Sequence, residues 1–163
     1  VTAKDVIAAV GADAFRFFML EHSPRSSMQF DLKLAKAKSK ENPVYYVQYA
    51  HARTSGILRK SKTKIDLKKA DWSLLETSPE ISLIKQVLLS IEVVDVTVQD
   101  FGVQRLTRYA YELARSFTHF YETTLVIGDD KKLTASRLAL VMLTRNTLQH
   151  ISKLLGISAP EKM

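Results

Sequence analysis

The stretch from Asn42 to Lys62 constrains the fold more than any other part of the sequence. Pro43 suits the first turn of a helix, where its missing N–H has no partner to lose. No further proline follows before the lysine-rich segment that starts near Lys60. The sequence therefore predicts one long helix, around which the other segments are organised.

One face of this helix is apolar. At about 100° per residue, Val44, Val47, Thr54 and Leu58 fall on the same side, with His51 among them. This stripe is expected to face the core. A lone histidine within such a stripe is typical of a buried imidazole that makes a hydrogen bond, so His51 is interpreted as a core residue.

The opposite face of the same helix combines aromatic and basic residues. Tyr46, Tyr49 and Arg53 follow one another at helical spacing, and Lys60 continues the line. Aromatic rings interleaved with cations can stack unpaired bases and neutralise phosphates. The alternative is that the tyrosines and the arginine pack against a second layer of helices. Helix geometry alone favours the alternative.

Composition favours a folded, basic protein. The chain has 163 residues with 46% hydrophobic content, enough for a core, and 24 Lys plus Arg against 17 Asp plus Glu give a formal charge of +7. This charge favours nucleic acid as a partner, although an acidic membrane surface would also fit. No apolar run is long enough to span a membrane and no signal-peptide pattern is present, so we expect a soluble protein. The absence of cysteine excludes structural disulfides and fits a cytoplasmic protein.

Capping and stop signals divide the rest of the chain into helices. The β-branched residues 91–100 could form a strand, but a lone strand would have no partner, so we expect them to be helical. Apolar spacing predicts a core stripe of Ile81, Ile84, Leu88 and Ile91 and further stripes over 103–125 and 134–155. The expected fold is an all-α, antiparallel helical bundle. Helix caps are expected at Thr2, Asp13, Asp31, Ser78 and Thr134, and helix ends at Gly11, Gly102 and Gly156.

The segment from Arg59 to Lys69 carries six cations against Asp66 alone. Such a run is either a solvated linker or a surface that contacts phosphates, and the sequence leaves both open. Trp72 follows the run. A single tryptophan beside a linker more often anchors the loop to the core than stacks on a base, so we expect an anchor.

Residue patterns for catalysis or metal binding are missing. The four histidines lie on separate segments without a second ligand at helical spacing, and the five glycines are scattered, so no nucleotide-binding loop is predicted. We expect no catalytic residue, no metal and no cofactor in this chain. The sequence predicts a binding module rather than a complete enzyme.

Two runs of residues resemble arginyl-tRNA synthetases. The first leads from Gly11-Ala12-Asp13-Ala14 through a Ser-Pro loop to NPVYYVQYAHAR, which ends at Arg53, and the second comprises SRLALV and the terminal LLGISAPEKM. Together they span nearly the whole chain. These enzymes are class I synthetases, in which a Rossmann domain joins arginine to ATP and then to tRNA, and a C-terminal helical bundle reads the anticodon. Neither the HIGH signature nor the lysine-rich signature loop is present here.

The resemblance implies a domain division and a set of tRNA contacts. Residues 1–40 would be the tail of the catalytic region and residues 41–163 the anticodon-binding domain. ATP with Mg²⁺ and arginine would bind only in the absent domains, and the chain alone would be inactive. Bases are expected to stack on the aromatic residues while Arg53, Arg59 and Lys60 meet phosphates. The implied contact residues are Tyr46, Tyr49, Arg53, Arg59, Lys60, Phe120, Tyr121, Leu125 and Met163.

The expected partners are an arginine tRNA and the missing domains of the same protein, with no membrane and a monomeric chain. The rival hypothesis is a helical module whose basic surface binds an acidic protein. A preference for arginine tRNA over other tRNAs would distinguish the two hypotheses.

Overall fold

The computed structural model describes residues 2–23, 26–61 and 65–163. Within these ranges every regular element is a helix, so the predicted all-α class is confirmed. Pro24 and Arg25 of the predicted loop, and Lys62 and Lys64 of the basic run, lie outside the described residues. The elements are α1 (Ala3–Val10), α2 (Ala12–Leu20), α3 (Leu32–Lys36), α4 (Pro43–Ser61), the 3₁₀ turn η1 (Trp72–Leu74), α5 (Ser78–Asp100), α6 (Gln104–Thr123) and α7 (Lys131–Leu155).

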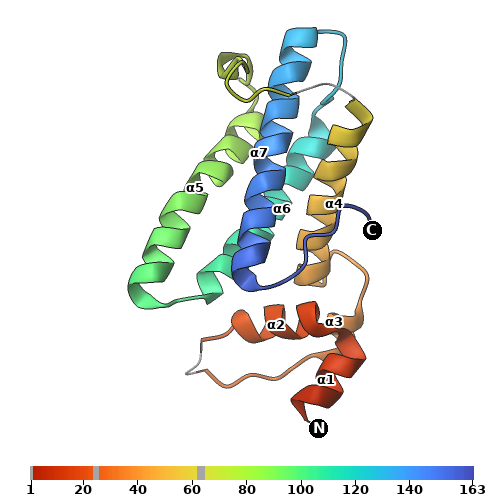
Figure 1. The fold of residues 1–163 in the computed structure, drawn as a ribbon, viewed down its shortest axis with the longest axis vertical. Coiled ribbons are helices and arrows are strands. Elements are labelled where there is room, and N and C mark those ends of the chain that lie inside the picture. The colour runs from red at the N-terminus through yellow and green to blue at the C-terminus, as the bar shows by residue number, and fades with distance from the viewer. Residues whose placement is uncertain (1, 24–25, 62–64) are drawn as a thin grey trace.

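Helices α4 to α7 form the bundle, and successive helices run in opposite directions along its long axis (Figure 1). The predicted antiparallel bundle is therefore confirmed. Helix α6 contacts α4, α5 and α7, and α4 also contacts α7. Because α4 and α6 run in the same direction side by side, their C-terminal halves meet at one end of the bundle.

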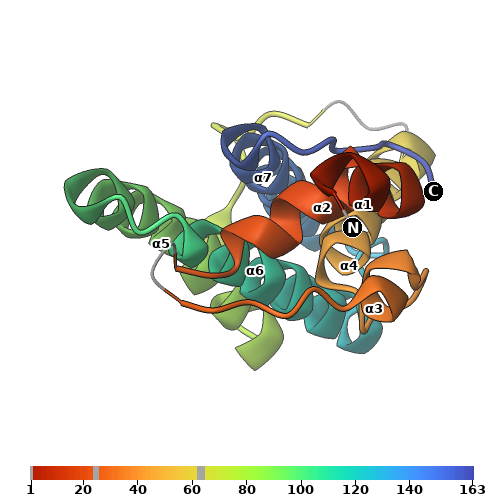
Figure 2. The ribbon, with the colours of Figure 1, turned by 90° about the horizontal axis from the view of Figure 1, so that it is seen from below.

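Helix α2 crosses the opposite end of the bundle (Figure 2), where it contacts α4, α6 and α7. Ala14, Phe17 and Phe18 of α2 are buried, whereas Met19 is 48% exposed. Helix α1 buries no residue and contacts only α2 and α3 among the described helices. The N-terminal segment thus adds side chains to the core through α2 and through Ala35 of α3.

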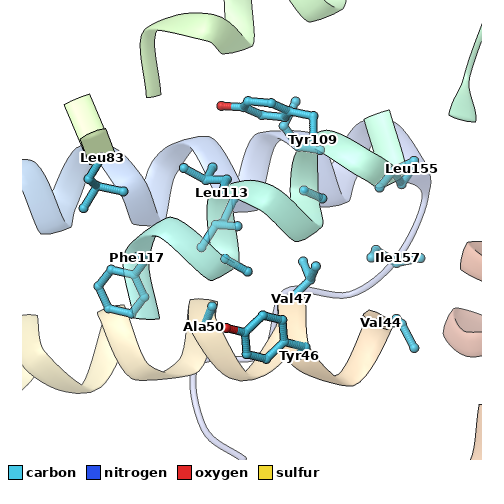
Figure 3. Packing of buried hydrophobic residues seen from close by; sticks show 14 of the residues in the cluster. Val44, Tyr46, Val47, Ala50, Leu83, Tyr109, Leu113, Phe117, Leu155 and Ile157 are labelled. Carbon is cyan, nitrogen blue, oxygen red and sulfur yellow. The ribbon is translucent and has the colours of Figure 1, made fainter. Parts of the chain in front are cut away.

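The core centres on α6, whose Leu113, Phe117 and Phe120 are at most 1% exposed. Figure 3 shows side chains from α4, α6 and α7 packed into one cluster. Helix α4 contributes the predicted stripe, because Val44, Val47, Thr54 and His51 are all buried and Leu58 packs against the cluster. The prediction for this face of α4 is confirmed.

Several predicted helix ends are confirmed. Thr2 forms a capping box with Asp5, and the Asp31 carboxylate accepts the Leu34 N–H. Gly11 at φ 86° and Gly156 at φ 67° end α1 and α7 in conformations that residues with a Cβ rarely adopt.

Three predicted caps are wrong. Helix α2 begins directly after Gly11, so Asp13 lies inside it. Ser78 and Thr134 also lie inside their helices, because Thr77 forms a capping box with Glu80 and Asp130 accepts the first N–H groups of α7. Thr77 and Asp130 have extended backbone and lie slightly upstream of the predicted caps, whereas α2 follows Gly11, whose φ is 86°.

The predicted core stripe of α5 is largely wrong. Ile81, Leu88 and Ile91 are 39%, 62% and 74% exposed, and only Ile84 of the four packs on the core. The buried residues of α5 are Glu80, Leu83 and Thr97. Helix α5 lies at the edge of the bundle (Figure 2) and, among the described elements, contacts only α6 and α7. One contact side cannot cover all the apolar residues that the helix carries.

The β-branched segment is helical, as expected, because α5 continues to Asp100. Phe101 then adopts φ 57° just before Gly102, which gives the predicted break. The expectation for Trp72 is not met, because its side chain is 36% exposed and Leu75 is buried instead. The turn η1 is held by the Ser136 hydroxyl, which donates to the carbonyl of Asp71 at 2.9 Å.

Candidate nucleic-acid interface

A pocket of about 630 Å³ opens where the C-terminal halves of α4 and α6 meet the C-terminal tail. This volume lies within the range of ligand-binding pockets. The lining comes from three segments that are far apart in sequence. It includes most of the predicted contact residues, namely Tyr49, Arg53, Arg59, Lys60, Tyr121, Leu125 and Met163.

Arg53 lies between two tyrosine rings at this pocket. Its guanidinium carbon is 5.3 Å from the centroid of the Tyr49 ring and 4.7 Å from that of Tyr121. One nitrogen donates to the Tyr49 hydroxyl at 2.6 Å and another to the Tyr121 hydroxyl at 3.3 Å. The cation attracts both ring faces, so the three side chains hold one another in place. We call them the Tyr-Arg-Tyr cluster.

Further rings support the Tyr-Arg-Tyr cluster from behind. Tyr45 stacks on Tyr49 with 6.4 Å between centroids, and Phe117 stacks on Tyr121 with 6.2 Å. Phe117 is buried in the core, whereas Tyr49 remains 39% exposed. The Tyr49 ring and the partly buried Tyr121 ring are therefore held in place by their neighbours, and the exposed part of the cluster can meet a flat ligand without further ordering.

The Tyr-Arg-Tyr cluster also borders a second pocket of about 380 Å³. This pocket reaches from the cluster toward Lys40 and Tyr45 at the start of α4. The cluster is therefore a partition between two hollows on one face of the bundle. An extended chain of flat groups, such as successive bases, could contact both of its sides.

Two predicted contact residues are placed differently. Tyr46 is only 8% exposed, and its ring packs against Tyr111 with 5.3 Å between centroids. Figure 3 shows it among the buried side chains. Phe120 is 0% exposed. The predictions that Tyr46 lies on an exposed face and that Phe120 offers a contact surface are wrong.

The physical reason is that α4 is covered on several sides. It contacts α2, α6 and α7, so its buried residues extend well beyond one stripe. Tyr46 therefore faces a second layer of helices, which was the alternative interpretation. Tyr49 and Arg53 lie one and two turns further along α4, where they line the pocket.

Sequence reasoning missed several residues of the pocket. Ala52 and Gly56 line it from α4 at i, i+4 spacing, and their small size leaves room for a ligand. That spacing of small residues beside Tyr49 and Arg53 was a usable signal. Ile127, 46% exposed at the pocket, carried no signal that distinguishes it from a core residue.

A buried ion pair positions the loop that carries Leu125. Arg137 of α7 donates to the carboxylate of Glu80 at 2.7 Å and to the Leu125 carbonyl at 2.8 Å. Glu80 is 0% exposed and also accepts the Thr77 N–H at 2.9 Å. Burial by itself raises the pKa of this carboxyl, but the hydrogen bonds from Arg137 and Thr77 outweigh it and lower the pKa. Glu80 therefore remains charged and holds Arg137 toward the loop.

The basic residues of the pocket differ in their partners. Arg59 donates to the carbonyl of Glu161 at 3.1 Å and lies 3.9 Å from its carboxylate. Both side chains are about half exposed, so this ion pair is weak and can be exchanged for a phosphate. Lys60 is exposed at the edge of the same pocket.

Two other kinds of site are not found in the part of the chain that the structure describes. No group of three or more histidine, aspartate or glutamate side chains is arranged to hold a metal ion. No described helix is both long and apolar enough to cross a membrane.

The model of the DALR anticodon-binding domain family matches residues 47–163, which include α4 from its second turn onward and the whole pocket. The chain belongs to this family. The match leaves out α1 to α3 and the first residues of α4.

Curated relatives of the whole chain are arginine–tRNA ligases. That of Dehalococcoides mccartyi is 44% identical over 164 aligned residues, and that of Geobacter metallireducens 45% identical over 167. Both alignments cover 100% of this chain but only 30% of the relative. The chain thus spans about a third of the length of the enzymes it resembles.

Solved structures agree with this similarity. An arginyl-tRNA synthetase structure from Campylobacter jejuni superposes with a TM-score of 0.88 at 30% identity, over 98% of this chain and 35% of the other. The synthetase from Thermus thermophilus gives 0.79 at 32% identity, over 95% of this chain and 27% of the other. The bundle and the N-terminal helices are therefore shared with these enzymes.

Proposed function

We propose that this DALR domain binds the anticodon stem-loop of an arginine tRNA as part of an arginine–tRNA ligase. The observation that carries the proposal is the Tyr-Arg-Tyr cluster, in which Arg53 is held between the exposed Tyr49 ring and the partly buried Tyr121 ring beside a pocket. Unpaired bases in an RNA loop bind by stacking on aromatic rings and on guanidinium planes. Membership of an anticodon-binding family and relatives named arginine–tRNA ligases support the same ligand.

The roles of the pocket residues follow from their chemistry. Tyr49 and Tyr121 offer ring faces to splayed bases, and Arg53 holds the two rings while adding positive charge. Arg59 and Lys60 meet backbone phosphates at the edge of the pocket. Leu125 and Met163, 72% and 55% exposed, offer apolar contacts to the same loop. None of these roles requires a metal ion.

The proposal extends to the whole protein. Residues 1–40 are proposed to be the tail of a catalytic region, and residues 41–163 the anticodon-binding unit. ATP with Mg²⁺ and arginine would be bound by the catalytic region, which would transfer arginine to the tRNA that this domain positions. The protein would act in the cytoplasm as a monomer.

Replacing Tyr49 or Tyr121 by alanine is expected to weaken tRNA binding by about 1–3 kcal/mol each, the range for loss of one base stack. Fluorescence anisotropy with labelled arginine tRNA measures the loss. Tyr49→Phe keeps the ring and removes only the hydroxyl that accepts from Arg53, so it should retain most of the affinity.

Arg115→Ala is the matched surface control. Arg115 lies on α6 like Tyr121, but its side chain is 67% exposed away from the pocket and pairs with Glu112. This variant should bind tRNA nearly as well as the unchanged protein. If the Tyr49→Ala and Tyr121→Ala variants bind arginine tRNA as tightly as the unchanged protein, the assignment of this surface is refuted. Equal affinity for arginine tRNA and other tRNAs would instead favour a module for an acidic protein.

Added salt should weaken binding. If Arg53, Arg59 and Lys60 each neutralise one phosphate of the single-stranded loop, raising the salt about fourfold weakens binding by roughly 20-fold. In the Lys60→Ala variant the slope of log affinity against log salt should be smaller by about 0.7. A flat salt response would exclude the phosphate contacts while leaving the stacking contacts open.

A further inference from the structure

The last residues of the chain do not hang free but run back along α4 to the pocket. After Gly156 ends α7, the Ile157 N–H donates to the Ser152 carbonyl at 3.0 Å and the Ile157 side chain is buried. The chain then lies beside α4 as far as Met163, which lines the pocket (Figure 1). We call residues 157–163 the C-terminal strap.

Helix α2 holds the beginning of the strap. Arg16 donates to the Gly156 carbonyl. The Asp13 carboxylate accepts the Ser158 N–H at 3.1 Å and the Ser158 hydroxyl at 2.5 Å. Gln48 of α4 donates to the same Asp13 carboxylate at 2.8 Å and to the Ser158 carbonyl at 3.1 Å. These bonds join α2, α4 and the strap at one point.

The middle of the strap is held by His51 of α4. Its Nδ1 lies 2.8 Å from the Pro160 carbonyl, and because a carbonyl oxygen only accepts, Nδ1 carries the proton. The residue is 0% exposed, and burial lowers the pKa of the imidazole below its ordinary value of 6.5. The ring is therefore a fixed neutral donor, which explains why a polar residue stands in the core stripe of α4.

Two arginines hold the end of the strap. Arg145 of α7 donates to the Glu161 carboxylate at 2.7 Å and to the Ser55 hydroxyl at 3.0 Å. Arg59 donates to the Glu161 carbonyl. Met163 follows two residues later at the pocket, so its position depends on every anchor before it.

We propose that Asp13, Gln48 and His51 are positioning residues for tRNA binding, because they hold the C-terminal strap as a preformed wall of the pocket. The proposal rests on the proposed function. Asp13 is the most telling of the three, because it lies on α2 and does not line the pocket, so it acts on bound RNA through its hydrogen bonds to the strap and to Gln48 rather than by direct contact. The N-terminal helices would thereby help to shape the RNA site.

The test combines Asp13→Ala with a variant that ends at Lys162. If loss of the Asp13 contacts reduces the docked fraction of the strap to roughly 10–30%, affinity for arginine tRNA falls about 3- to 10-fold. In a protein that already lacks Met163, Asp13→Ala should have little further effect on affinity. Both changes remove the same contact, the one between Met163 and the RNA. Asp13→Asn keeps an acceptor oxygen and should restore most of the affinity.

A second measurement does not depend on RNA. The Ser158 amide, which donates to Asp13, should exchange its hydrogen faster in the Asp13→Ala protein, while amides of α6 remain protected. Additive effects of Asp13→Ala and loss of Met163, or unchanged affinity in the Asp13→Ala protein, would overturn the proposal.

If removing Met163 leaves binding unchanged while Tyr49→Ala weakens it, the strap proposal fails and the proposed function stands. If Tyr49→Ala and Tyr121→Ala also bind normally, the proposed function fails.

Discussion

Replacing Arg137 by methionine is expected to lower the free energy of unfolding by about 3–5 kcal/mol, the cost of leaving a buried charge without its partner. Glu80 is 0% exposed, and Arg137 is the cation that pairs with it. Methionine approximates the length of the arginine stem, so lost packing contributes little. Urea denaturation of the purified variant measures the change.

The double variant Glu80→Gln/Arg137→Met separates charge from shape. Glutamine keeps an acceptor for the Thr77 N–H but carries no charge, so the double variant should recover most of the lost stability. A loss below about 1 kcal/mol in the single variant, or no recovery in the double, would contradict the role assigned to the pair.

The same pair predicts a pH dependence. The pKa of Glu80 is lower in the folded protein than its ordinary value of 4.5, because the hydrogen bonds outweigh burial. Its contribution to stability is therefore complete above pH 4.5 and is lost as the pH falls through the folded-state pKa. The Glu80→Gln/Arg137→Met protein should lose less stability over that acidic interval than the unchanged protein.

Replacing Tyr46 by alanine is expected to cost about 3–5 kcal/mol of stability, the range for truncating a buried aromatic residue. The ring is 8% exposed and packs against Tyr111 in the space between α4 and α6. The truncation leaves a cavity that neighbouring helices can fill only in part. Thermal and urea unfolding both report the loss.

Tyr49→Ala is the matched control for Tyr46→Ala, since the two residues are a turn apart on α4 and differ mainly in burial. Tyr49 is 39% exposed, so its truncation should cost about 1 kcal/mol of stability or less while weakening tRNA binding. Tyr46→Phe keeps the ring and should remain near the stability of the unchanged protein. A stable Tyr46→Ala protein with weakened tRNA binding would reverse these roles and restore Tyr46 to the RNA surface.

These opposite expectations show where sequence reasoning about α4 succeeds and where it fails. The core stripe of Val44, Val47 and His51 followed from helical periodicity, because a helix always turns one side toward its main packing partner. The burial of Tyr46 could not be predicted in this way. It depends on how α2 and α6 pack around α4, and the periodicity of α4 carries no information on that packing. The same limitation explains α5, where apolar residues such as Ile91 remain exposed at the edge of the bundle.

Local signals of the sequence determined the helical class, most helix ends and the aromatic and basic character of α4, because each depends on residues within one or two turns. The stops at Gly11 and Gly156 are examples, since only the backbone of a few neighbours decides them. Only the tertiary structure decided which tyrosines remain exposed, how Arg53 is held between Tyr49 and Tyr121, and how Asp13 reaches the strap. Those contacts join residues up to 145 positions apart, and no local pattern encodes a distance of that kind.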